Sequence, residues 1–107
     1  MTLEVLIDDV RCFRDGRPAR IARSSAGGLA LLRELTGQRI DVLWLDHDLG
    51  GDDTIMPVID WLVHERPTVE LVQLHTANVS ALQGMKQPLL KAGYQVARSY
   101  DLAMWTW

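Results

Sequence analysis

The sequence has little of what defines several common classes of protein. Its 107 residues include one cysteine, Cys12, so no internal disulfide can form. No run approaches the roughly 20 apolar residues of a membrane-spanning helix, and the first residues lack the basic segment and apolar run of a secretory signal. The net charge of −3 provides no general attraction to nucleic acid or to an anionic membrane. We therefore expect a soluble, cytoplasmic protein with no membrane partner, in which a local site holds any phosphate ligand.

The composition and the pattern of the sequence favour one α/β domain. Hydrophobic residues make up 48% of the chain and charged residues 23%, which is typical of a globular domain with a single core. Short β-rich runs alternate with amphipathic segments, and this alternation indicates an open parallel sheet with helices. We expect residues 1–107 to form one domain.

The strand signals are short and regularly spaced. The run at 40–45 is apolar on both faces, as expected for a central parallel strand covered by helices. The segment 10–18 is rich in Arg, Gly and Asp and predicts a loop. The runs that predict strands are 3–7, 19–23, 40–45, 69–74 and 94–97.

Three segments show helical spacing of apolar residues: 25–36, the segment from Thr54 to just before Pro67, and 79–92. Ser24 or Ser25 can cap the first helix, and Thr54 can cap the second. Pro88 should kink or break the third helix.

Polar side chains follow three of the predicted strands. They are Asp8-Asp9, Asp46-His47-Asp48 and His75-Thr76. Ligands bind beyond the carboxyl ends of the strands in open parallel sheets, so these residues should meet at one edge. Two carboxylates about 4 Å apart repel by roughly 4 kcal/mol at an effective dielectric of about 20. The cluster therefore needs a shared proton, an arginine such as Arg11, or a Mg²⁺ or Mn²⁺ ion bound by Asp8, Asp9 and Asp46.

Structural roles compete with functional ones for several of these polar residues. His64 lies near the predicted end of a helix, where a cation suits the helix dipole. His47 and His75 each follow a strand and can act as the acid and base of a phosphoester reaction, or can be structural. Turn residues expected to shape the entry to the second helix, and therefore left out of the site, are Gly50, Gly51, Asp52 and Asp53.

Three sequence blocks carry a family resemblance: DDVR at 8–11, LDHDLG at 45–50 and HTAN at 75–78. In kind and in order they resemble the Asp-Asp-x-Arg, LDHDLG and His-Ser/Thr-x-Asn blocks of the cyclic-phosphate processing receiver domain. This family is a divergent branch of the response-regulator receivers. The resemblance implies a receiver-like or flavodoxin-like three-layer sandwich with sheet order 2-1-3-4-5 and a reduced helix set. The loop at 10–18 would replace the usual first helix.

The resemblance also implies an activity, the processing of cyclic phosphates on nucleotides or at RNA ends. Under that hypothesis His47 and His75 form an acid–base pair, and Asp46 and Asp48 complete the catalytic group. Arg11 and Thr76 bind phosphate, while Asn78 either binds phosphate or caps the next helix. The substrate would be a small phosphorylated molecule or an RNA end.

Two other hypotheses stay open. The tail at 102–107 is apolar, and either it packs back on the sheet or Trp105 and Trp107 engage a protein partner or a second copy of the chain. The domain would then be a non-catalytic interaction module. A third hypothesis makes Asp46 a phosphoacceptor, as in ordinary receivers. Those proteins carry a lysine near the end of the fifth strand, followed by proline, where Arg98 is a poor substitute and Lys91 comes too early.

Overall fold

The computed structural model describes residues 2–98 and 104–106 and consists of short strands and three α-helices. The 3₁₀ turn η1 (Val79–Ala81) precedes the third helix. The elements are β1 (Glu4–Ile7), β2 (Arg11–Phe13), β3 (Arg20–Ala22), α1 (Ser25–Glu34), β4 (Ile40–Leu45), α2 (Met56–Glu65), β5 (Val69–Leu74), α3 (Leu82–Lys91), β6 (Val96–Arg98) and β7 (Met104–Thr106).

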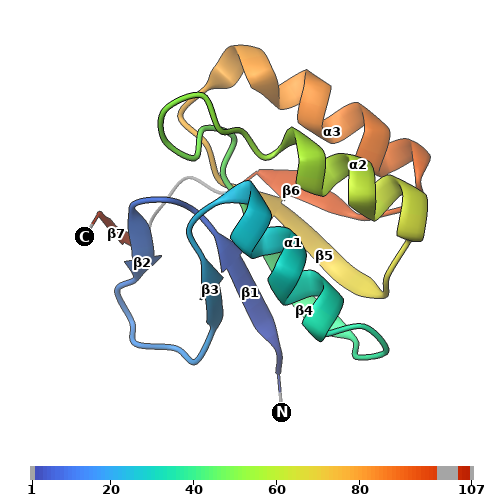
Figure 1. Cartoon of the computed structure of the whole chain (residues 1–107), viewed down its shortest axis with the longest axis horizontal. Helices are drawn as coiled ribbons and strands as arrows, with labels where there is room; N and C mark the ends of the chain where they lie inside the picture. The colour runs from blue at the N-terminus through green and yellow to red at the C-terminus, as the bar shows by residue number, and fades with distance from the viewer. Residues whose placement is uncertain (1, 99–103, 107) are drawn as a thin grey trace.

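Five parallel strands form the main sheet in the order β3-β1-β4-β5-β6 (Figure 1). Counted within this sheet, the order is 2-1-3-4-5, as predicted. Ile7 is in register with Leu45, and Leu45 with Leu74, so β1, β4 and β5 end side by side. The ladder continues one residue further, because the Asp46 amide donates to the Ile7 carbonyl and the His75 amide to the Leu45 carbonyl. This register brings the three polar segments together.

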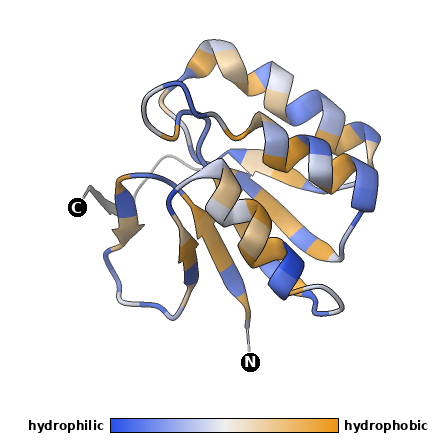
Figure 2. Cartoon of the chain, in the orientation of Figure 1, coloured by the Kyte–Doolittle hydropathy of each residue, from blue (hydrophilic) through white to orange (hydrophobic). Residues whose placement is uncertain are grey.

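The three helices pack against one face of the sheet (Figure 1). Leu32 of α1, Ile59 of α2 and Leu89 of α3 are buried there against alternate strand residues. Figure 2 shows the hydrophobic colouring along the central strands and on the helices that cover them. Burial of apolar surface at about 25 cal/mol per Å² drives this packing. No helix in the described part of the chain is long and apolar enough to cross a membrane.

The opposite face of the sheet shows how the helix set is reduced. A second buried cluster of Leu6, Phe13 and Trp44 lies there, and Ala19 packs against it. Among the residues that the structure describes, no helix contributes to this cluster. The segment that follows β1 therefore covers this face in place of the helix expected in an ordinary receiver.

The prediction that residues 10–18 are entirely loop is wrong for Arg11–Phe13. These residues form β2, which pairs antiparallel with β7 in a separate two-stranded sheet. The partner strand lies more than 90 positions further along the chain, so local pattern gave no sign of it. The tail thus returns to pair with β2 rather than with the main sheet, while residues 102, 103 and 107 lie outside the described part.

The predicted cap of the first helix is confirmed, because the Ser24 hydroxyl accepts from the Gly27 amide at 2.9 Å. The predicted cap of the second helix is wrong, because the N-cap of α2 is Ile55, which makes no side-chain capping bond. Thr54 lies one residue earlier, and its hydroxyl accepts from the Met56 amide at 3.3 Å. A kink or a break was predicted at Pro88, and the break is wrong, because α3 continues through Pro88 to Lys91. A proline removes one helix hydrogen bond, and the complete burial of Leu89 next to it helps to offset that loss.

Candidate active site

The polar segments after β1, β4 and β5 converge at the carboxyl edge of the sheet. Asp8, Asp46 and His75 are the first residues beyond these strands. Asp8 is 0% exposed, Asp46 9% and His75 1%. Such burial of charged and polar groups requires partners, and those partners define the site.

Three carboxylates form the acidic part of the site. Asp8, Asp9 and Asp46 each offer an oxygen, and these oxygens all lie within 4.8 Å of one another. Asp8 Oδ1 accepts from the amides of Val10 and Arg11 at 2.9 and 3.0 Å. Asp8 Oδ2 is buried and has no hydrogen-bond partner among the described residues. A buried, unpartnered carboxylate oxygen beside two further carboxylates fits a divalent cation such as Mg²⁺ or Mn²⁺.

The electrostatics of Asp46 reflect this crowding. Burial and repulsion from Asp8 raise the pKa of Asp46 from 3.8 to about 6. Hydrogen bonds from the Thr76 side chain and the His47 amide, together with the charge of Arg11, act in the opposite direction. A cation at this position would favour the ionised carboxylate.

Arg11 and His75 form the second contact of the site. Arg11 Nη1 lies 2.7 Å from His75 Nε2. A guanidinium only donates hydrogen bonds, so Nε2 accepts and the imidazole is neutral with its proton on Nδ1. The contact joins the first sequence block to the third and places the guanidinium near the carboxylates.

His47, Asp48 and Asn78 form the third contact, closer to solvent. His47 Nδ1 lies 3.0 Å from Asp48 Oδ1, and Asn78 Nδ2 donates to Asp48 Oδ2 at 3.2 Å. These bonds hold the pKa of Asp48 below its usual value. Asn78 Oδ1 also accepts from the Ala81 amide and caps η1. Capping, one of the two roles expected for Asn78, is therefore present, and one of its two amide hydrogens is left for a ligand.

The residues assigned to turns behave as turn residues. Gly50 and Gly51 have φ values of +90° and +56°, which favour glycine. Asp53 accepts hydrogen bonds from the backbone and hydroxyl of Ser25, at the start of α1. His64 is exposed in the last turn of α2, away from the edge where the site lies.

Arg23 is a contributor that the sequence interpretation missed. Its Nη1 donates to the carbonyls of Asp8 and Arg11, the first and last residues of the first sequence block. Its position directly after a strand of the same parallel sheet was the available signal, because such residues reach the same edge.

Comparison with known families identifies the family in which this arrangement of sequence blocks occurs. The family model described as the cyclic-phosphate processing receiver domain matches residues 3–92. Comparisons with curated proteins and with solved structures gave no match. The matched segment includes all three sequence blocks and the strands β1, β3, β4 and β5 that position them. The chain belongs to the cyclic-phosphate processing receiver domain family.

Proposed function

We propose that this protein hydrolyses cyclic phosphate esters, either on nucleotides or at 2′,3′-cyclic phosphate ends of RNA. One observation carries the proposal: the three sequence blocks contact one another at one edge of the sheet. The 2.7 Å contact of Arg11 with His75 and the 3.2 Å contact of Asn78 with Asp48 join them. An arginine, two histidines and a carboxylate cluster in one place supply the groups that phosphoester hydrolysis needs.

In this reaction a water attacks phosphorus and one ring P–O bond breaks, which leaves a phosphomonoester. We assign proton transfer from the water to His47, whose side chain is 16% exposed and reaches solvent. Asp48 engages the imidazole through Nδ1, so Nε2 is the nitrogen that we assign to accept the proton. The proton returns through solvent to the leaving oxygen.

We assign to Arg11 the stabilisation of negative charge on the phosphate, with Thr76 and Asn78 as further hydrogen-bond donors to phosphate oxygens. We assign His75 the positioning of Arg11, because its Nε2 is already engaged by the guanidinium and its side chain is buried. This assignment narrows the hypothesis drawn from the sequence, in which both histidines transfer protons.

Asp8, Asp9 and Asp46 would hold Mg²⁺ or Mn²⁺, since Asp8 Oδ2 is buried without a partner in the described structure. A bound ion would supply positive charge to a phosphate oxygen. The role of the chain itself is to hold the three carboxylates within 4.8 Å of one another.

The test measures turnover of 2′,3′-cyclic nucleotides and of a short RNA with a cyclic phosphate end, with and without Mg²⁺ or Mn²⁺. His47→Ala should lower kcat by about 10²- to 10⁴-fold, the usual contribution of a general acid–base group. His75→Ala should chiefly raise KM, because the arginine that binds phosphate loses its partner. His64→Ala is the matched control and should leave both constants unchanged, since His64 is exposed in the last turn of α2.

Other outcomes would redirect the assignment. An equal loss of kcat in His47→Ala and His75→Ala would restore the two-histidine acid–base pair. A folded wild-type protein with no turnover under any condition would support the interaction-module hypothesis. A mass increase at Asp46 after incubation with acetyl phosphate would support the phosphoacceptor hypothesis instead.

A further inference from the structure

Arg23 connects the end of β3 to the turn that carries the first sequence block. Its Nη1 donates to the Asp8 carbonyl at 3.1 Å and also to the Arg11 carbonyl. These carbonyls lie on either side of Asp9 and Val10, so one guanidinium nitrogen spans the turn. Inside the turn, Asp8 Oδ1 accepts hydrogen bonds from the amides of Val10 and Arg11. The turn is therefore fixed by its own aspartate and by the arginine that directly follows β3.

The same junction also holds the second sequence block. The Ser25 amide donates to Asp53 Oδ2 at 2.8 Å, and the Ser25 hydroxyl donates to the other carboxylate oxygen. Asp53 lies near the end of the loop that begins at Asp46, so this loop is fixed by Ser25, two residues away from Arg23. Residues 23–25 thus hold both loops that carry the carboxylates of the site.

We propose that Arg23 is a positioning residue, which sets the geometry of Asp8 and Asp9 for a divalent cation and of Arg11 for a phosphate. The proposal rests on the proposed function for its catalytic consequence. Its structural consequence, the placement of Arg11 on His75 and of Asp8 beside Asp46, is independent of turnover. Partners that orient metal ligands typically contribute 10- to 100-fold to affinity or activity.

The loss of Arg23 acts on the turn in a defined way. Arg23→Gln is too short to span the turn and leaves the Asp8 and Arg11 carbonyls without this donor. The turn is then fixed by Asp8 alone, and the 2.7 Å contact of Arg11 with His75 loses its support. Arg23→Lys keeps a charged donor but loses the planar fork, so it should keep part of the support that Arg23 gives to the turn.

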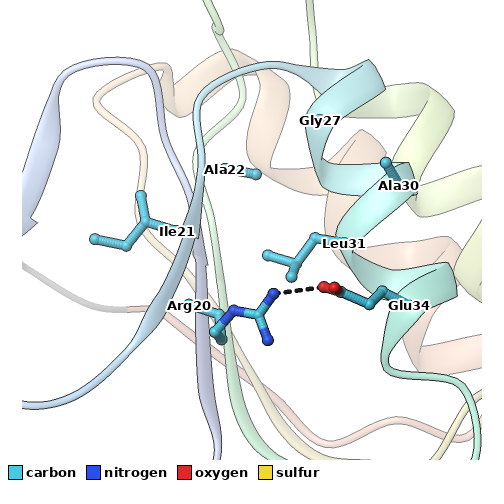
Figure 3. Close-up of a pocket in the computed structure, with 7 residues that line it drawn as sticks. All are labelled: Arg20, Ile21, Ala22, Gly27, Ala30, Leu31 and Glu34. Atoms are coloured by element: carbon cyan, nitrogen blue, oxygen red, sulfur yellow. Dashed lines mark hydrogen bonds and ion pairs between the residues drawn. The ribbon is translucent and has the colours of Figure 1, made fainter.

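Arg20, at the start of β3, provides a matched control. Figure 3 shows its side chain directed across the groove between β3 and α1, toward Glu34. Arg20 is the first residue of β3, whereas Arg23 follows its last residue. The two side chains form an ion pair and are 49% and 61% exposed. Exposed pairs of this kind contribute little to stability. Arg20→Gln removes the same charge from β3 without touching the site.

The experiment compares wild type, Arg23→Gln, Arg23→Lys and Arg20→Gln by three measurements. Calorimetry gives the Mn²⁺ affinity, ¹⁵N NMR of the metal-free protein gives the tautomer of His75, and turnover of 2′,3′-cyclic nucleotides gives kcat and KM. We expect Arg23→Gln to weaken Mn²⁺ binding by about 10- to 100-fold and to shift His75 away from the Nδ1-protonated form. Arg23→Lys should be intermediate, and Arg20→Gln should match wild type.

The outcomes separate this proposal from the proposed function. A folded Arg23→Gln with the Mn²⁺ affinity and the His75 tautomer of Arg20→Gln overturns the positioning role. If Arg23→Gln does not fold, Arg23→Lys decides by the same comparison, and if wild type binds no Mn²⁺ the His75 resonances decide. If the wild-type protein turns over none of the substrates but Arg23→Gln still shows the expected changes in Mn²⁺ affinity and His75 tautomer, the proposed function is rejected and the positioning role is kept.

Discussion

Asp46 is the residue at which burial and charge oppose each other most directly. Its pKa in the folded state, about 6, lies above the ordinary value of 3.8. The folded protein therefore binds more protons than the unfolded chain between about pH 4 and pH 6, and its stability falls as the pH rises through that range. Asp46→Asn removes the charge but keeps an oxygen for the His47 amide. At roughly 1.4 kcal/mol per pKa unit, we expect metal-free Asp46→Asn to be about 1–3 kcal/mol more stable than wild type at pH 7.

Urea unfolding in the presence of a chelator measures this difference. The gain should be present at pH 7 and absent near pH 4. Asp48→Asn is the control in the same loop, because hydrogen bonds lower the pKa of Asp48. Its contribution has the opposite sign, and it is lost as the pH falls through the lowered pKa. A destabilised Asp46→Asn would mean that its carboxylate is compensated without a metal.

At the level of elements, the loop between β4 and α2 depends on its attachment to α1. Asp53 accepts two hydrogen bonds from Ser25, and these bonds lower its pKa. The attachment therefore stabilises the fold above the ordinary carboxyl pKa and is lost as the pH falls through the lowered value. Asp53→Asn keeps one acceptor and loses the charge, so we expect a loss of about 1 kcal/mol in the free energy of unfolding at pH 7. Asp52→Asn changes an exposed neighbour and should leave stability unchanged; equal effects of the two variants would contradict the attachment.

The secondary structure also shows where sequence patterns succeed. The period of apolar residues predicted the five strands of the main sheet and all three α-helices, because burial on one or both faces imposes that period. It did not predict β2, since a three-residue strand is defined by its distant partner β7 rather than by its own composition. The prediction at Pro88 considered only the helix hydrogen bond that a proline removes, yet packing of α3 on the sheet outweighs that loss.

At the scale of the whole molecule, the candidate active site was predictable from the sequence only in part. The rule that parallel strands end together predicted that Asp8, Asp46 and His75 converge. It could not separate the two histidines, because burial of His75 and its contact with Arg11 come from tertiary structure. Arg23 was missed for a related reason: its position after a strand places it at the same edge, but its contacts are to backbone carbonyls, which the sequence does not single out.

The stability of the whole molecule should respond to a divalent cation. An ion that binds the folded protein alone stabilises it by RT ln(1 + [L]/Kd), which is about 2.7 kcal/mol at 100 times Kd. One kcal/mol shifts the Tm of a domain of this size by about 4–8 °C. We therefore expect saturating Mg²⁺ or Mn²⁺ to raise the Tm of wild type by about 10 °C or more, and scanning calorimetry can measure it.

Asp8→Asn should abolish most of this shift, because it removes the fully buried carboxylate whose Oδ2 has no other partner in the described structure. Asp60→Asn on α2 is the control, since it removes an equal charge from an exposed position of a helix. A shift that is the same in both variants would come from general screening of the net charge of −3 rather than from a site. A shift that Asp8→Asn alone removes would place the ion at the carboxylates, where it would also offset the repulsion that raises the pKa of Asp46.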